Sequence, residues 1–414
     1  MLGGAVFLQT TGDPAFAALS QFSRWNGEVL RTVLAVSSVA ALLLFATATI
    51  ALPRLSLTAY RRAKLATLTV LVLTAVALPI GQRAFLRFAS GHPLRFAHDG
   101  GVVQTEESAR FLLRGENPYA ADFSATPLRE AGIPAVLQHN PYLPGSFLLA
   151  VPFVAAADAA GLPFDMRLVY LALYGFAIAV VPLAFRGAGT GEVARTGFAL
   201  APLVVPFLVV GRNDVAFLAF LLFALVALAR RRATGFFLGL AAACATKQLA
   251  WFVAPFLLVH AWHALPRPAF RRGVLWGAAL FAAVVVPFVA WGPADFWDDV
   301  YRFNAGLGTS PYPLGGTPGF GFAMLAADLG WAADRNAYYP LTPYLLATAA
   351  PLALWLLWRL NRRPSLAFAV LSAFLVSFWV LFFARVFNNN YLGFLAFLVQ
   401  MGALFAVDER RAME

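Results

Sequence analysis

The stretch "LATLTVLVLTAVALPIGQRAF", residues 65–85, decides the class of fold. It is apolar almost throughout and has one charged side chain, Arg83. A helix needs about 20 predominantly apolar residues to cross the hydrocarbon core of a bilayer. Residues 65–85 are therefore predicted to span a membrane. The basic segment "RLSLTAYRRAK" at 54–64 precedes the span and is typical of a cytoplasmic turn.

The whole chain shares this character. Of its 414 residues 61% are hydrophobic and 12% charged, and the mean hydropathy is +0.73. A soluble domain has roughly half apolar and a quarter charged residues. The net charge of +11 would suggest nucleic acid in a soluble chain, but here basic loops that contact membrane lipids explain it, and no nucleic-acid partner is expected. Cys244 is the only cysteine, which excludes an internal disulfide and a thiolate metal cluster, and the N-terminus lacks the basic start of a signal peptide.

Apolar runs recur from end to end and predict an all-α polytopic membrane protein, one integral membrane domain over residues 1–414. We expect a bundle of about 10–12 transmembrane helices. The runs are residues 29–52, 65–85, 146–160, 168–185, 197–210, 215–229, 235–260, 274–291, 341–358, 365–384 and 391–407.

Two long polar segments interrupt the apolar runs, at about 87–143 and 292–340. Basic residues at 54–64, 359–363 and 410–411 are predicted to lie in the cytoplasm. Both polar segments are then extracytoplasmic loops on the same face of the membrane. Their length and polar content indicate functional loops rather than connectors.

The orientation of the middle of the chain stays open. The triplet "RRR" at 230–232 and the cluster Arg267, Arg271 and Arg272 should both be cytoplasmic, but one full span between them forbids this. Either the apolar run 235–260 is broken near Lys247, or one basic cluster violates the positive-inside rule. The number of helices between 186 and 272 is therefore undecided by sequence.

The first polar loop contains "HDGGVVQTEESARFLLRGENPY", residues 98–119. Thr105 suits a helix N-cap, and Glu106 and Glu107 suit the first turn, four and three residues before Arg110. Gly115 suits the left-handed residue that ends a helix. A short helix over 106–114 is therefore predicted at the membrane surface.

Asp99 precedes this helix, between His98 and two glycines that permit a sharp turn and leave room for a ligand. One interpretation is that Asp99 caps a turn. The other is that it is a general base at the membrane–water boundary, where partial desolvation raises the pKa of a carboxylate. Gln104 and Glu106 would then hold an acceptor or orient Asp99, although Glu106 is as well explained by a salt bridge on the helix surface.

The stretch 98–119, followed by "HNPYLPGSFLLAVP" at 139–152, resembles the first outer loop of GT-C membrane glycosyltransferases. The bacterial glycosyltransferase family 87, which includes mannosyltransferases, is the most similar branch. The matching features are Asp99, the "G-x-N-P-Y" turn with Asn117 and Tyr119, and the "Y-x-P" segment that starts at Tyr142. The resemblance extends to residues 211–258 and to "RVFNNNYLG" at 385–393, but one additional span precedes the span that leads into Asp99.

The resemblance implies a function. A hexose such as mannose, or a pentose, would move from a polyprenyl-phosphate donor to a lipid or glycan acceptor, with inversion and with Asp99 as the base. The site would face outward from a bacterial cytoplasmic membrane. No cofactor is implied, and a divalent metal is possible but not indicated. The oligomeric state stays open.

Such a reaction needs cations for the donor phosphate. Lys247, in an apolar run, is one candidate, and pairing with Asp214 or snorkelling is its alternative. Arg385, at the outer end of a span, is a second candidate, and a headgroup anchor is its alternative. Arg302 in the second loop is a weaker candidate. Phenylalanines of the later spans could form a groove for the prenyl chain, but packing explains them as well.

The remaining candidates are polar residues beside apolar runs, each with a turn as its alternative role. His139 and Asn140 could bind sugar hydroxyls. The "RND" triplet could line a cavity or form an interhelical turn. The asparagines of the late motif could donate to phosphate or sugar. These residues are His139, Asn140, Arg212, Asn213, Asp214, Asn388 and Asn390.

Rival functions differ in the sequence features that they require. A ligase of lipid-linked glycans would use the same outer face. A transporter or flippase of lipid-linked substrates should show an internal duplication with broken helices at matching positions, and none is visible in the sequence. A zinc enzyme is disfavoured by the scattered histidines, and direct ATP use by the missing phosphate-binding loop.

Overall fold

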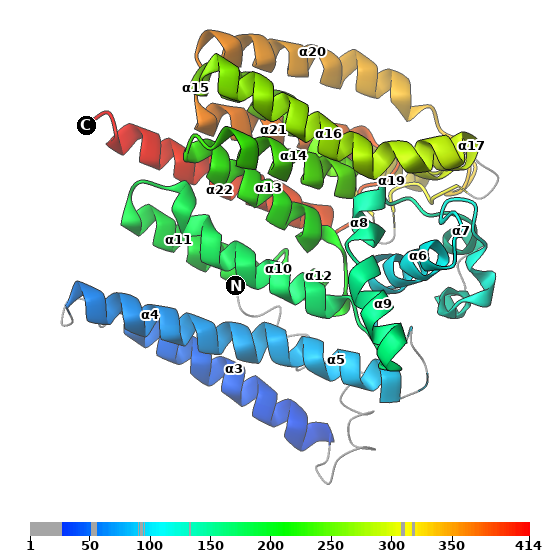
Figure 1. Cartoon of the computed structure of the whole chain (residues 1–414), viewed down its shortest axis with the longest axis horizontal. Coiled ribbons are helices and arrows are strands. Elements are labelled where there is room, and N and C mark those ends of the chain that lie inside the picture. The colour runs from blue at the N-terminus through cyan, green and yellow to red at the C-terminus, as the bar shows by residue number, and fades with distance from the viewer. Residues whose placement is uncertain are drawn as a thin grey trace.

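The computed structural model describes residues 27–50, 56–89, 91, 94, 96–131, 134–307, 311–316 and 319–414, without the side chains at 27–35, 38, 57, 99 and 134. Helices make up the fold, and over these ranges there is no strand, only isolated bridges such as that between Gly315 and Val386. The prediction of an all-α polytopic membrane protein is confirmed (Figure 1).

Helices of the bundle alternate along the chain with short helices of the two loops. The first group is α3 (Gly27–Ile50), α4 (Leu57–Val72), η2 (Leu73–Ala77) and α5 (Leu78–Ala89). The first loop contains η3 (Asp99–Val103), α6 (Gln104–Leu113), η4 (Phe123–Ala125), η5 (Pro127–Ala131) and α7 (Pro134–Gln138). The middle group is α8 (Pro144–Leu148), α9 (Val151–Ala160), α10 (Arg167–Val180), η6 (Val181–Ala184), α11 (Ala188–Ala199), α12 (Val205–Val210), α13 (Asp214–Ala229), α14 (Ala233–Thr246), η7 (Gln248–Phe252), α15 (Ala254–Ala264) and α16 (Arg267–Trp291). The second loop contains α17 (Pro293–Trp297), η8 (Asp298–Arg302), α18 (Phe303–Ala305) and α19 (Gly321–Asp328), and α20 (Leu341–Arg362), α21 (Leu366–Phe383) and α22 (Tyr391–Arg411) end the chain.

Six helical segments of the described chain are long and apolar enough to cross a membrane, and four more apolar helices are shorter. Several of the predicted spans are therefore partial crossings. The six long segments are Thr58–Ala89, Arg167–Ala184, Arg267–Trp291, Leu341–Arg362, Leu366–Phe383 and Tyr391–Arg411. The four shorter ones are Val39–Ile50, Pro144–Ala160, Asp214–Ala229 and Ala233–Thr246.

The apolar run 235–260 is broken at Lys247, which is one of the two possibilities that the sequence leaves open. The backbone of Lys247 is extended, with φ −153° and ψ 135°, and it ends α14. The chain then reverses through η7 into α15. Both basic clusters consequently lie at one end of the bundle, where the α13–α14 and α15–α16 turns border the same cleft. Both clusters therefore satisfy the positive-inside rule together.

Close contact between α13 and α14 requires a small residue. A Cβ atom on Gly239 of α14 would lie 2.8 Å from the Phe223 ring and 3.0 Å from the backbone nitrogen of Ala224, both on α13. Small residues at such positions let membrane helices pack by direct backbone approach. The two short helices thus form one rigid antiparallel pair.

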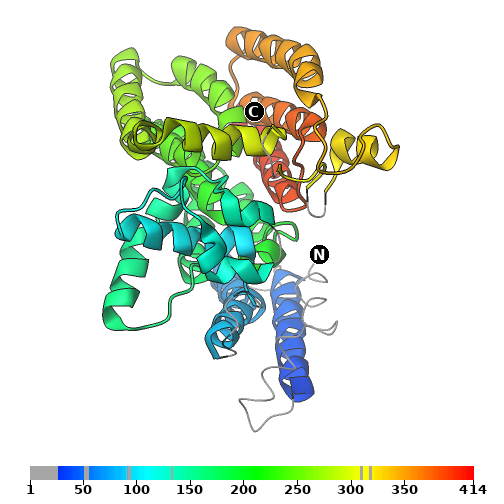
Figure 2. The same cartoon turned by 90° about the vertical axis from the view of Figure 1, so that its right-hand side faces the viewer.

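The two long loops pack against each other at the opposite end of the bundle, which confirms that they share one face of the molecule. The Nδ1 atom of His139 lies 2.7 Å from Asp299 Oδ1, and the amide of Asn140 donates to Asp299 Oδ2 at 2.8 Å. Figure 2 looks onto this end, with the first loop in cyan and the second in yellow. The basic residues of α4 and of the ends of α20 and α22 lie at the other end (Figure 1).

The short helix of the first loop differs from its prediction in three ways. It begins at Gln104 after the π-helical turn η3, so Thr105 is not the N-cap, and its hydroxyl donates to Gly101 O at 2.8 Å. Most of α6 is buried rather than lying at a surface. Glu107 pairs with Arg110 as expected, at 2.7 Å, but Glu106 does not.

The predicted end of this helix is confirmed. Gly115 has φ +78°, its amide donates to Leu112 O at 3.0 Å, and the amide of Glu116 donates to Phe111 O at 2.9 Å. This pair of bonds is a Schellman motif.

Cysteine labelling can test the arrangement on a Cys244→Ser background. Ser124→Cys in the first loop and Asp328→Cys in the second should react with a membrane-impermeant maleimide from the same side. Asn361→Cys at the end of α20 should react only after permeabilisation. Reaction of the two loop cysteines from opposite sides would contradict the fold at the point where the two loops meet.

Candidate functional site

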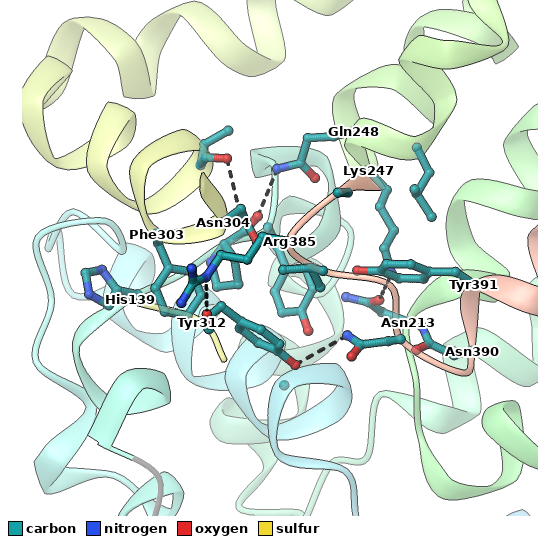
Figure 3. A pocket seen from close by; sticks show the side chains of 18 of the residues that line it. His139, Asn213, Lys247, Gln248, Phe303, Asn304, Tyr312, Arg385, Asn390 and Tyr391 are labelled. Carbon is teal, nitrogen blue, oxygen red and sulfur yellow. Dashed lines mark hydrogen bonds between the residues drawn. The ribbon is translucent and has the colours of Figure 1, made fainter. Parts of the chain in front are cut away.

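A cavity of about 490 Å³ lies beneath the two loops. It gathers many of the residues singled out in the sequence, from both loops, the α14–η7 break and the α21–α22 junction (Figure 3). The predicted site residues on its wall are Gln104, His139, Tyr142, Arg212, Asn213, Lys247, Arg385, Asn388 and Asn390. Such a volume falls in the usual range for small-molecule sites.

The floor of the cavity is set by the short helices. α14 has 14 residues and α16 has 25, and both start from the same basic end. At 1.5 Å per residue, α14 ends roughly 16 Å short of α16. The floor at Lys247 therefore lies below the level at which α16 ends.

The floor carries a closed ion pair. Lys247 Nζ lies 2.5 Å from Asp214 Oδ1 and 2.9 Å from Asn213 Oδ1, and Asn390 donates to the other carboxylate oxygen of Asp214. The ammonium also lies 5.3 Å from the Tyr391 ring centroid. The alternative of pairing with Asp214 is confirmed for Lys247, so its charge is already neutralised.

Arg385 holds the second loop in place. Its guanidinium donates to the carbonyl oxygens of Tyr312 at 2.5 Å, Ala337 at 2.9 Å, and Arg335 and Asn336 at 3.2 Å. Four of the five N–H groups of a guanidinium are thereby used. Direct bidentate binding of a phosphate by Arg385 would break this network, so the predicted direct role is not supported by the geometry.

The charge of Arg385 nevertheless remains. Burial lowers the pKa of Arg385 to about 10, which leaves the side chain protonated at neutral pH. Its partners are neutral carbonyls, and over the described residues no carboxylate lies within ion-pair distance of it. It therefore supplies a positive potential to the cavity wall.

Unlike Lys247 and Arg385, Arg212 has a guanidinium group that a ligand in the cavity could reach. The residue is half-buried and lines the cavity, and no hydrogen bond or ion pair joins its guanidinium group to another described residue. Gly211, with φ +98°, turns the chain between α12 and α13 and places Arg212 there. The cavity interpretation of the "RND" triplet is thus confirmed for Arg212 and Asn213, whereas Asp214 is engaged with Lys247.

The backbone of Asp99 lies at the rim of this cavity, because its neighbours His98 and Gly100 both line it. The side chain of Asp99 lies outside the described part of the structure. Gly101 leaves no room for a ligand, contrary to expectation, whereas Gly100 lines the cavity. A Cβ on Gly101 would lie 2.0 Å from Gly211 O, and one on Gly100 would lie 2.7 Å from the Tyr142 hydroxyl. Gly101 instead permits η3 to touch the Gly211–Arg212 turn, and Gly100 permits the Tyr142 hydroxyl to approach.

Glu106 lies away from the cavity, in a buried ionic network. It binds Arg87 through both oxygens, at 2.6 and 3.0 Å, and accepts from the amide of Met166 at 2.8 Å. Arg87 also contacts Asp165, which in turn pairs with Arg167. The network ties the first loop to α5 and α10. Glu106 does not line the cavity, so the geometry does not support direct contact with an acceptor substrate, and the predicted surface salt bridge is wrong because the observed pair is buried.

Four other candidates also have structural contacts outside the cavity. Asn117 accepts from the amide of Tyr119 at 3.1 Å, and the Tyr119 hydroxyl donates to Tyr142 O at 2.7 Å. Asn140 donates to Ser108 Oγ at 3.1 Å. Arg302 is exposed and pairs with Asp298 at 3.0 Å. These contacts position the loops.

Several lining residues were not predicted from the sequence. Gln248, Asn304, Tyr312 and Tyr391 contribute polar groups to the wall (Figure 3). Gln248 and Tyr391 directly follow predicted site residues and could have been included on that ground. Asn304 and Tyr312 lie in the second loop, whose sequence shows no periodic pattern that would predict which side chains face the cavity.

A metal-compatible group lies behind His139. The group consists of one ligand atom from each of three residues, and these atoms lie within 4.8 Å of one another. The residues are His139, Asp298 and Asp299. Burial raises the pKa of Asp299, and its two oxygens already accept from His139 and from the amide of Asn140. In the described structure these atoms therefore join the loops by hydrogen bonds.

No protein-family model, curated protein or solved structure matches the chain. The chemistry of the site is therefore argued from its own residues.

Proposed function

We propose that the chain is an integral membrane glycosyltransferase that moves a sugar from a polyprenyl-phosphate donor to a lipid or glycan hydroxyl. One observation carries the proposal: a cavity sunk below the loop end has cationic walls and the backbone of Asp99 at its rim. Among the described residues no carboxylate lies within ion-pair distance of Arg212 or Arg385, so an anionic ligand would supply the missing direct partner. The wall also carries the side-chain amides of Gln104 and Asn304. Their nitrogens already donate to backbone carbonyls, so their oxygens are the groups that would accept from sugar hydroxyls.

An apolar side of the same cavity suits a prenyl chain. Leu249, Phe252 and Leu381 line it together with the cationic residues. A lipid phosphate would place its charge near Arg212 and its chain against these side chains. A soluble sugar nucleotide would gain nothing from the apolar side.

The proposed reaction uses one carboxylate. Asp99 takes the proton of the acceptor hydroxyl, whose oxygen attacks the anomeric carbon. The bond from that carbon to the phosphate oxygen breaks, and the lipid phosphate leaves with the electron pair. The guanidinium of Arg212 and the potential of Arg385 stabilise the developing negative charge. Attack opposite the leaving group inverts the configuration.

The orientation belongs to the proposal as well. The arginine-rich turns lie at the end opposite the cavity, and such turns favour the cytoplasm. The cavity would then face outward from a bacterial cytoplasmic membrane.

A transporter is the second candidate, because the helical break at Lys247 resembles the discontinuous helices of transporters. The two functions differ in purified protein. Transfer of labelled sugar from a polyprenyl-phosphate donor to an acceptor in detergent needs no second compartment. Absence of transfer, with uptake into proteoliposomes, would support transport instead. A ligase of lipid-linked glycans would transfer an oligosaccharide where a monosaccharide donor fails.

Arg212→Gln should weaken donor binding by about 10- to 100-fold, as expected from removing a hydrogen bond to a charged group. Binding of a polyprenyl-phosphate analogue to detergent-purified protein measures this. Arg302→Gln is the matched control, because that arginine is exposed and pairs with Asp298. An unchanged affinity in Arg212→Gln would remove Arg212 from the donor site.

A further inference from the structure

A second large cleft, of about 1030 Å³, lies at the end of the bundle opposite the donor cavity. It is bordered by the end of η6, the α13–α14 turn and the start of α16. Four arginines line it and none of its lining residues is acidic. They are Arg230, Arg231, Arg232 and Arg272.

The α13–α14 turn holds these arginines in an unusual backbone. Arg231 has φ +55°, the only positive φ of a non-glycine residue in the described chain. Its amide donates to Leu228 O at 2.9 Å, and the amide of Arg232 donates to Ala227 O at 2.8 Å. This is a Schellman motif with arginine where glycine is the favourable residue. An arginine side chain is thus retained at position 231 although the left-handed backbone there disfavours any residue with a Cβ atom.

Only one of the four arginines is engaged with the protein. Arg230 donates to Leu183 O at 2.6 Å and to Phe185 O at 3.5 Å. Arg231, Arg232 and Arg272 are exposed, and no hydrogen bond or ion pair joins their guanidinium groups to another described residue. Three guanidinium groups therefore converge on one cleft without a counter-charge from its walls.

An exposed apolar strip continues from this cleft along the bundle. Leu183 and Phe223, on its wall, are 50% and 36% exposed. Phe176, further along α10, is 45% exposed, and its ring centroid lies 6.3 Å from that of Phe223. A cationic pocket that opens onto an apolar strip matches a charged headgroup with attached acyl chains.

We propose that this cleft binds the phosphate headgroup of an anionic phospholipid, with its acyl chains against Leu183, Phe223 and Phe176. Basic pockets between membrane helices bind anionic headgroups in this way. The apolar strip commits the site to a lipid, because a soluble phosphate would leave it bare. The site is separate from the donor cavity and does not depend on the glycosyltransferase proposal.

The test uses the full chain in nanodiscs of equal amounts of phosphatidylcholine and phosphatidylglycerol, with retained lipid measured by native mass spectrometry. Selective retention of phosphatidylglycerol is expected. Neutralising each arginine should weaken it by about fivefold, so R231Q/R232Q/R272Q should weaken it on the order of 100-fold. R61Q/R62Q/R363Q removes three exposed arginines at the same end but outside the cleft, and should retain the lipid. R231K/R232K/R272K should keep most of the selectivity.

Arg231→Gly separates binding from folding. Glycine relieves the positive φ, so the melting temperature should stay equal or rise while phosphatidylglycerol retention falls. Equal retention in the cleft triple and the control triple, or unchanged retention in Arg231→Gly, would overturn the proposal. Displacement of the lipid by millimolar inorganic phosphate would also overturn it, in favour of a soluble anion.

Discussion

Asp99→Asn should lower the rate of sugar transfer by roughly 10²–10⁴-fold, the usual contribution of a general base. Asn is nearly isosteric with Asp but cannot accept a proton at neutral pH. Folding and donor binding should be nearly unchanged, because the cations of the cavity remain. The measurement is transfer from a labelled polyprenyl-phosphate donor by purified protein in detergent or nanodiscs, together with donor affinity and melting temperature.

Glu107→Gln is the control for Asp99→Asn. Glu107 lies eight positions along the same segment and pairs with Arg110 outside the cavity, so its replacement should leave transfer close to the wild-type rate. Glu106→Gln is a poorer control, because it also disturbs the buried pair with Arg87. Wild-type transfer by Asp99→Asn would make Asp99 a turn cap. Glu106 and Asp214 could not readily replace it, since each is held in an ion pair with a cation, and the base would have to be sought at His139, which lines the cavity.

Lys247→Met should destabilise the protein by about 3–5 kcal/mol, the cost of removing one partner of a buried ion pair. The carboxylate of Asp214 would remain buried, with Asn390 as its only remaining donor among the described residues. The double variant Lys247→Met/Asp214→Asn removes both charges and should recover much of this loss. Thermal unfolding of the three proteins in one detergent measures the effect.

Lys64→Met is the matched control for Lys247→Met, because Lys64 lies at the opposite end of the bundle and has no carboxylate partner in the described chain. It should melt close to the wild-type temperature. A Lys247→Met protein with wild-type stability but with donor affinity lost would show that the ammonium serves the phosphate. Its pairing with Asp214 would then be secondary.

The first loop shows how far local sequence can predict a site. Gly115 ends α6 as expected, because a left-handed residue is decided by its own backbone preference. Glu107 finds Arg110 because residues three apart are neighbours on any helix. Glu106 had the same local option, but its partner is Arg87, 19 residues away. Only the packing of α6 against the bundle determines which of the two carboxylates binds a distant partner.

For the cations of the site, too, the sequence predicts their position but not their availability to a ligand. Lys247, Arg212 and Arg385 all stood out in the sequence as charges beside apolar runs, and all three line the cavity. Which of them is available to a ligand is a tertiary property. Lys247 is neutralised by Asp214 from another helix, and Arg385 is held by carbonyls 50 and 73 positions away. Only the guanidinium of Arg212 is left, among these three cations, without a hydrogen bond or ion pair to a described residue.

The sequence by itself determined that this is a helical membrane protein, where its apolar runs lie, and that its two polar loops share a face. These properties depend only on local sequence: about 20 apolar residues suffice to span the bilayer, and the basic residues next to each run set its orientation. The tertiary structure decided that the run 235–260 breaks at Lys247, and hence that a cavity forms between full-length helices. A buried ammonium needs an anionic partner, and the partner of Lys247 is Asp214, which lies 33 residues away. The residues next to Lys247 in the sequence therefore do not predict this pairing.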